Sequence, residues 1–408
     1  MVPRNQTRCG DMDMIKKWAV AGLLLLSPLA LAGCWDRKEI NDVAFVIGSS
    51  VDKENGMYRS ALQIALPGNL GGAGSKGGGG GTSGGKSYYL ESKTGITLRS
   101  ANMEIQAGNS RNLSFSHRRV LLVGEEFARD GIAPMLDQFA RIPQNRLSSL
   151  VAVTSGSAYK ILDAAAPMEQ FSSEMIREMI NEFTKRPDSL KQLVNMLMTD
   201  GVDVALPYLS IQEAVPPGVG TSKNNIQVTG LALFDEDKFV GALEGQEGKI
   251  INLAMNQAPS PDIIVDGPHG KGHISIRFSE NEAKLKPVVR GNDITMTIEI
   301  YAKGAVYEND SNSIISDEHS LRDLERRASE EIVDKVQLAM RSLQHKYNSD
   351  ILGFGRTIYE NDPKAWQRFK GNWKKVYPEV RVIVKPELHI ENIGAVGKPF
   401  GRKEIRND

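Results

Sequence analysis

The segment ITMTIEI, residues 294–300, alternates strictly between apolar and polar side chains. Successive side chains of a β-strand point to opposite faces of a sheet, so this period predicts a strand with one buried face. The isoleucines and the methionine would lie on the buried face, and the threonines and the glutamate on the other. The last third of the chain is therefore expected to contain a half-buried sheet.

Segments on either side of this strand extend the sheet and cover it. Residues 273–278 and 283–289 predict two more strands, which form a three-stranded meander with residues 294–302. Residues 318–347 carry a continuous apolar stripe at helical spacing, and a helix of that length would measure about 45 Å. We expect this helix to lie on the apolar face of the sheet. A closing strand should run from residue 380 to 390, broken or bent at Pro386.

The first part of the chain mixes strand and helix patterns. Val- and Ile-rich segments predict strands, whereas other segments repeat apolar residues every three or four positions and predict helices. This mixture indicates an α+β domain spanning residues 34–200, interrupted by a Gly-rich loop at 68–85 that contains too few apolar side chains to form a core. The expected strands are 43–51, 57–66, 120–123 and 150–154, and the expected helices are 96–105, 131–139, 158–165, 171–183 and 189–198.

Turn residues mark a change of organisation after residue 200. A hairpin is expected from residues 226–234 and 238–243, followed by a helix at 246–256. We interpret residues 201–260 as a small middle domain and residues 261–400 as a C-terminal domain containing the meander and the long helix. The predicted fold class is thus α+β, with an N-terminal, a middle and a C-terminal domain after a cleaved signal peptide.

Residues 1–33 have the plan of a secretory signal, with a basic head, an apolar centre and small residues at the end. The apolar run at 19–32 is short for a membrane span, which needs about 20 residues. Its ending, LAGC, resembles a bacterial lipobox, so we expect cleavage after Gly33 and attachment of a diacylglycerol to Cys34. An ordinary signal peptide and an uncleaved anchor are the alternatives. Translation could begin at Met1, or at the methionines at positions 12 and 14.

Composition excludes several classes of function. The 408-residue chain has 50 basic and 50 acidic residues, which gives no electrostatic footprint for nucleic acid. Of its two cysteines, only Cys34 would remain after cleavage, so disulfides, thiolate zinc sites and catalysis by a free thiol are not expected. The fold must then be stabilised by its core alone.

Four motifs suggest chemistry, and each is better explained without it. Residues 80–87 match a phosphate-binding loop ending in Lys86, but a strand-like segment follows where a helix is needed. His117 has no nucleophile or carboxylate placed by spacing, so we interpret it as structural. His269 and His273 lie among glycines and a proline that oppose a metal-binding helix. The acidic turn at 235–237 lacks the spacing of a calcium loop. We therefore expect no cofactor, no metal and no catalytic residue.

Short motifs in a common order resemble the Ger(x)C spore germination lipoproteins, the C subunits of nutrient germinant receptors. The lipobox is followed by Trp-Asp at 35–36. Further on, an aromatic residue, a small residue and a histidine, at 115–117, precede a strand that ends in Gly-Glu at 124–125. Ser116 stands where the family has glycine. The turn DILGFG at 350–355 and two tryptophans, Trp366 and Trp373, expected on one helical face, complete the resemblance, which covers nearly the whole mature chain.

The resemblance implies three mixed α/β domains, each a mixed sheet flanked by helices, and a function without catalysis. It implies a lipid-anchored protein on the outer face of the cytoplasmic membrane, which is the inner membrane of the spore, working with integral-membrane A and B subunits. The alternative is a solute-binding lipoprotein of an uptake system. That class has two lobes around a cleft, whereas here a meander is followed by one long helix. Neither the germinant nor the contact surface can be inferred from the sequence.

Overall fold

The structure is a computed structural model. It describes residues 42–66, 87–141, 147–164, 166, 168–212, 225–311, 313–315 and 317–393, together with Met14, Lys17, Trp18 and Ala21. The predicted lipid site at Gly33 and Cys34, the Gly-rich loop and Lys86 lie outside the described residues. In the part that is described, the helices are all too short or too polar to cross a membrane.

A nine-stranded mixed sheet forms the first half of the fold, in the order β3-β2-β1-β5-β6-β7-β8-β9, with β4 paired to β1. The central strands β1, β5, β6 and β7 run parallel to one another, and the outer pairs are antiparallel. The strands are β1 (Val43–Glu54), β2 (Met57–Ala65), β3 (Tyr88–Gly95), β4 (Asn112–Ser114), β5 (Val120–Gly124), β6 (Leu150–Thr154), β7 (Ala205–Gln212), β8 (Asn225–Asp235) and β9 (Lys238–Glu244).

Helices cover both faces of this sheet because its central strands are apolar on both sides. In β5, Leu121 and Val123 pack with one group of helices, whereas Val120 and Leu122 pack with the other. The first group is α3 (Glu125–Asp130), α4 (Ala133–Arg141) and α7 (Leu190–Leu197), and the second is α5 (Ala158–Leu162) and α6 (Ser172–Phe183). A further helix, α2 (Leu98–Ala107), begins at a capping box formed by Thr97 and Ser100.

The expectation that residues 201–260 have a sheet of their own is wrong, although their hairpin and helix form as expected. Strand β7 pairs in parallel with β6, and the hairpin of β8 and β9 continues the same sheet. The physical reason is that β8 is apolar on both faces, since Leu231 and Leu233 enter one core and Ala232 and Phe234 another. Such a strand needs a neighbour on the main sheet, and the domain boundaries at 200 and 260 stay predictions.

A four-stranded sheet, β10-β11-β12-β13, forms the second half. Its strands are β10 (Asp262–Asp266), β11 (His273–Arg290), β12 (Asp293–Asn309) and β13 (Arg381–Asn392). The two strands expected at 273–278 and 283–289 are one strand, β11, which bulges between Phe278 and Glu280 and continues along β12. The bulge shifts the register and so conceals the continuity in the sequence pattern. Strand β10 was not expected.

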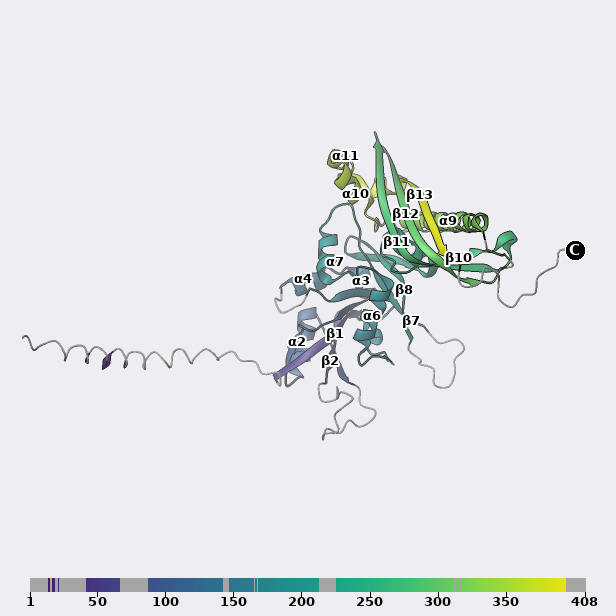
Figure 1. Ribbon diagram of the computed structural model, residues 1–408. Helices are drawn as coiled ribbons and strands as arrows, with labels where there is room; N and C mark the ends of the chain where they lie inside the picture. Colours follow the sequence, from purple (N-terminus) through teal and green to yellow (C-terminus); the bar gives the residue numbers. More distant parts are fainter. Residues whose placement is uncertain are drawn as a thin grey trace, which may run out of the picture.

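Strand β13 does not break at Pro386, which pairs with Ile300 of β12 in a parallel ladder. The strand lies at the edge of its sheet, where a missing N–H is tolerated because one side makes no ladder bonds. The predicted alternation in β12 is confirmed, since Ile294, Met296 and Ile298 are buried. In Figure 1, β11 and β12 extend together as long arrows toward α10 (Phe354–Asn361) and α11 (Pro363–Phe369).

The predicted long helix is present as α9 (Glu318–Arg341), which packs along β13 and buries its apolar stripe against the second sheet. Residues Ser342–Tyr347 continue it as a π-helical turn, so the regular helix is shorter than expected. In this turn the buried Gln344 donates to the carbonyl oxygens of Tyr377 and Val380, at 3.0 and 2.8 Å. The wider turn therefore coincides with a polar anchor for the chain that leads into β13.

The two halves share one hydrophobic core. Helix α8 (Gly245–Ala254) packs against α9, and its buried Ile251 and Leu253 join Leu231 and Leu243 of the first sheet to Ile276 of the second. Because these side chains form one contiguous hydrophobic cluster, they pack the first sheet against the second through α8. The junction between the halves is consequently the place where residues distant in sequence meet.

Candidate functional site

The turn at residues 350–355 is built around a buried carboxylate. Asp350 is 1% exposed and accepts hydrogen bonds from the backbone N–H groups of Phe354 and Gly355, at 2.8 and 2.9 Å. The indole Nε1 of Trp373 donates a third, at 3.0 Å. Burial raises the pKa of Asp350 to about 7, while the N–H donors favour its charged form. The carboxylate thus satisfies the first turn of α10 and fixes the tryptophan.

A second aspartate ties this turn to the first half of the chain. Asp203 accepts from the Asp350 N–H at 2.7 Å, and its own N–H donates to the Asp350 carbonyl oxygen at 2.9 Å. Lys374 forms ion pairs with Asp203 at 2.9 Å and with Asp235 at 2.6 Å. We call Asp203, Asp235, Asp350, Trp373 and Lys374 the junction cluster. Burial raises the pKa of Asp203, and Lys374 partly offsets the rise.

Two glycines allow the backbones to meet beside this cluster. Gly201 has φ +75° and accepts a hydrogen bond from the Arg356 N–H at 2.7 Å. A Cβ atom on Gly201 would lie 2.6 Å from that nitrogen, and one on Gly355 would lie 2.7 Å from the Gly201 Cα. Side chains at either position would force the two segments apart. The Gly-Phe-Gly part of the turn is therefore a contact surface for the 201–203 loop.

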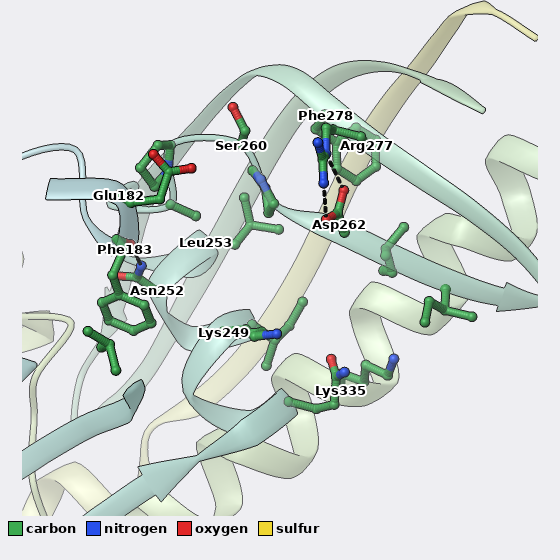
Figure 2. A pocket seen from close by; sticks show the side chains of 18 of the residues that line it. Glu182, Phe183, Lys249, Asn252, Leu253, Ser260, Asp262, Arg277, Phe278 and Lys335 are labelled. Atoms are coloured by element: carbon green, nitrogen blue, oxygen red, sulfur yellow. Dashed lines mark hydrogen bonds and ion pairs between the residues drawn. The ribbon is translucent and has the colours of Figure 1, made fainter. Parts of the chain in front are cut away.

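A concave surface, which we call the junction groove, lies between the two sheets and has a volume of about 820 Å³ (Figure 2). Its apolar wall includes Phe183, Leu253 and Phe278, and Asn252 donates to the Phe183 carbonyl oxygen at 2.6 Å. Its charged lining includes Glu182, Lys249, Asp262, Arg277 and Lys335. The guanidinium of Arg277 donates two hydrogen bonds to the carboxylate of Asp262, at 2.7 and 2.8 Å, which Figure 2 marks with dashed lines.

A second cavity, of about 300 Å³, shares Phe183 and Asn252 with the junction groove. It lies between α7, the end of α8, strand β7 and the 351–360 segment, and its lining includes Asp188 and Arg356. Burial raises the pKa of Asp188 to about 6, and nearby Arg186 offsets part of the rise. Both cavities thus lie where the two halves of the chain meet, which is a common location for binding sites.

The residues considered and rejected from the sequence are dispersed. The ring of His117 makes an edge-to-face contact with Phe45, at 5.1 Å between centroids, in keeping with a structural role. In the acidic turn, Asp237 accepts from the Ala133 N–H and Asp235 pairs with Lys374, so these carboxylates serve α4 and the junction cluster. His273 lies 3.2 Å from Asp266, and the side chain of His269 is outside the description. The residues that the structure describes contain no cluster of three or more metal-ligating side chains.

The segment after Lys86 is a strand, β3, as its composition indicates, whereas a phosphate-binding loop requires a helix there. The two tryptophans expected on one helix lie on α11 and α12 (Trp373–Val376), yet their rings touch edge to face with centroids 5.3 Å apart. The expectation of a shared helical face is therefore wrong. A short 3-10 turn separates the helices and brings the rings together in space.

Several charged residues at the junction were not singled out from the sequence. Asp188, Asp203 and Lys374 stand in ordinary polar surroundings in the sequence, and only the places that they take in the folded chain distinguish them. Arg118 is likewise buried, with its Nε bonded to Ser149 and its guanidinium 4.3 Å from the Phe139 ring centroid. The nearest sequence signal was the resemblance at 350–355 and Trp373, which marks Asp350 and the donors to its carboxylate but neither Asp203 nor Lys374.

Comparisons with known proteins agree across the whole described fold. Residues 36–211 match the family model "Spore germination protein N-terminal domain", and residues 229–394 match "Spore germination B3/ GerAC like, C-terminal". The Bacillus subtilis protein YfkR is 38% identical over 92% of this chain and 97% of its own length. Spore germination protein KC of the same organism is 27% identical over 97% of this chain and its full length.

A solved structure also matches in fold. The crystal structure of the GerBC protein superimposes with a TM-score of 0.55, covering 88% of this chain and all of that one, at 18% identity. The first family model ends at residue 211 in β7, and the second begins at residue 229 in β8. The chain therefore belongs to the Ger(x)C family of spore germination proteins.

Proposed function

We propose that the chain is a non-enzymatic, lipid-anchored subunit of a nutrient germinant receptor in bacterial spores. Its partners are the integral-membrane A and B subunits, and its lipid holds it on the outer face of the cytoplasmic membrane, the inner membrane of the spore. The observation that carries the proposal is the match of both halves of the chain to spore germination family models. The shared core supports a protein whose two halves act as one body toward a partner.

The chemistry of the junction supports a binding role over a catalytic one. The buried carboxylate of Asp350 receives three N–H donors and lines neither the junction groove nor the second cavity, whereas a general base must reach a substrate proton. Asp203 is held by Lys374 in an ion pair. These groups stabilise the junction. We therefore assign the function of the protein to binding at its surfaces and grooves.

The lipid anchor is tested by mass spectrometry of protein extracted from membranes. We expect a diacylglyceryl cysteine at position 34 as the new N-terminus, and Cys34→Ala should abolish both the modification and tight membrane retention, since two acyl chains are needed for stable anchoring. Cys9→Ala is the matched control, because the other cysteine precedes the cleavage site. An unmodified Cys34 in protein that still partitions with membranes would contradict the anchor.

The receptor role is tested in a spore strain in which this receptor is the only one left. Deletion should abolish or slow germination with some nutrients, while agents that bypass receptors should still act. An anchorless Cys34→Ala protein should restore the response poorly, above all at low expression, because tethering raises the effective concentration of partner sites. Normal germination with amino acids, sugars and nucleosides, together with loss of uptake of one solute, would favour a solute-binding lipoprotein instead.

A further inference from the structure

Strand β3 ends the first sheet, and its outer edge is unpaired among the described residues. The N–H of Leu66 donates to the Ser87 carbonyl oxygen at 2.9 Å, which sets the alternation of the antiparallel ladder between β2 and β3. The odd-numbered residues of β3 therefore bond to β2, and the backbone groups of Leu90, Ser92 and Thr94 point away from the sheet. Such an edge is a ready template for pairing with another strand.

The edges of the other outer strands, β9, β10 and β13, are obstructed. A side chain bonds to the strand in each case: Tyr347 to the Ala242 carbonyl oxygen of β9, Arg327 to the Asp266 carbonyl oxygen of β10, and Glu325 to the Ile390 N–H of β13. Each contact places a side chain where a further strand would have to pair. In the described part of the chain, the outward backbone groups of Leu90, Ser92 and Thr94 have no such contact, so β3 is open to a partner.

The charges on β3 indicate which strand would fit. Glu91 and Lys93 lie two positions apart on one face, and Lys93 is exposed and forms no ion pair with any described residue. If two copies of β3 pair antiparallel about Ser92, Glu91 lies opposite the partner's Lys93, and the same contact repeats across the two-fold axis. A centre at residue 91 or 93 would instead place like charges opposite each other. The charge pattern therefore favours a second copy in one register.

Exposed apolar side chains flank the same edge. Tyr89 is 47% exposed, and Ile96, at the start of α2, is 82% exposed. In the register centred on Ser92, Tyr89 lies opposite the partner's Gly95 and beside the partner's Ile96. Pairing would remove these side chains from water and would also satisfy the outward backbone groups.

We propose that two copies of this chain pair through β3, antiparallel and centred on Ser92, and so join their first sheets into one continuous sheet. The inference concerns assembly of the chain with itself and goes beyond the receptor role proposed above. It is measured on the protein alone or in membranes, so a failure of either proposal leaves the other standing.

Cysteine cross-linking in membranes tests the register. Ser92→Cys should give a disulfide-linked dimer under mild oxidation, because the Cα atoms of two opposite residues in such a pair lie about 5.5 Å apart, within the range for a disulfide. Thr94→Cys is the matched control, since it would face the partner's Leu90 and its two copies would lie about 13 Å apart along the strands. Both variants are made in a Cys9→Ala background, which by itself reveals any cross-link through Cys34.

Sedimentation equilibrium of the detergent-solubilised full chain measures the affinity. We expect a reversible dimer with a Kd on the order of 10 µM. Lys93→Glu should weaken it by about tenfold or more, because like charges then lie opposite each other, and the double variant Glu91→Lys/Lys93→Glu should regain most of the loss. Lys160→Glu, an exposed lysine on α5, is the control and should leave the dimer unchanged. All these variants should melt close to the wild type.

Three results would overturn the proposal. One is a monomer at concentrations up to about 100 µM, which a dimer of the expected affinity excludes. Another is cross-linking of Thr94→Cys as efficient as that of Ser92→Cys, or cross-linking of Ser92→Cys to a different protein alone. The third is full affinity in Lys93→Glu.

Discussion

Replacement of Asp350 by asparagine tests the assignment of this carboxylate as the structural centre of the junction. The asparagine oxygen can keep one or two of the three N–H donors now 2.8–3.0 Å from the carboxylate, while its NH₂ group would face another donor. A hydrogen bond to a charged group contributes about 1.5–3 kcal/mol, and the neutral side chain recovers part of the cost of burying the charge. We expect a net loss of about 2–4 kcal/mol in the free energy of unfolding.

Urea unfolding of the purified protein, followed by tryptophan fluorescence, measures this loss, since Trp373 donates to the carboxylate. The matched control is Asp362→Asn, because Asp362 caps α11 by accepting from the Ala365 N–H at 2.9 Å but lies on the surface. We expect about 1 kcal/mol or less for the control. A midpoint for Asp350→Asn that equals the wild type or exceeds that of the control would refute the structural assignment.

The same variant makes a prediction about pH. The folded pKa of Asp350, about 7, lies above its unfolded value of 3.8, so between these values the folded state binds more protons than the unfolded state. Stability should therefore fall as pH rises through this window, and Asp188, with a folded pKa of about 6, acts in the same direction. Asp350→Asn should flatten the decline in urea midpoint from pH 4 to 7. An unchanged slope would show that other groups cause it.

Three further perturbations probe the junction, the long helix and the Gly-rich loop. Gly201→Ala should lower the free energy of unfolding by more than about 2 kcal/mol, because its Cβ would lie 2.6 Å from backbone atoms. The control, Gly156→Ala, has φ +72° with open space around it and should cost about 1 kcal/mol. Thermal or urea unfolding measures both. Ile332→Ala should cost about 2–5 kcal/mol because its side chain is fully buried, whereas the half-exposed Leu338→Ala should cost about 1 kcal/mol or less in the same assay. Halving the loop at 71–84 should change stability by only about 0.6 kcal/mol, and a large drop in melting temperature would show that the loop packs against the fold.

Local periodicity determined the individual elements. The alternation in β12 and the stripe of α9 both survive in the structure, because each reflects one element packed against one apolar surface. The strands expected at 120–123 and 150–154 form as β5 and β6 for the same reason. The motifs in common order also identified the family, and the family models confirm that identification.

Long-range pairing could not be predicted from the same patterns. The bulge in β11 interrupts its period and makes one strand resemble two, and Pro386 is tolerated only because β13 lies at a sheet edge. The first sheet is extended by β7, β8 and β9. This pairing depends on which strand of the sheet has a free edge, and the local sequence pattern does not contain that information.

The contacts within the junction cluster and the lining of the smaller cavity were decided by tertiary structure alone. Asp188, Asp203 and Lys374 are ordinary polar residues in the sequence, far apart along the chain. In the folded chain, burial removes water from Asp188 and Asp203 and raises the pKa of both carboxyl groups. Asp203 forms an ion pair with Lys374, whereas Asp188 has no hydrogen-bond donor among the described residues. Desolvation depends on everything that packs around a group, so only the folded chain could distinguish these residues from solvated acids and bases.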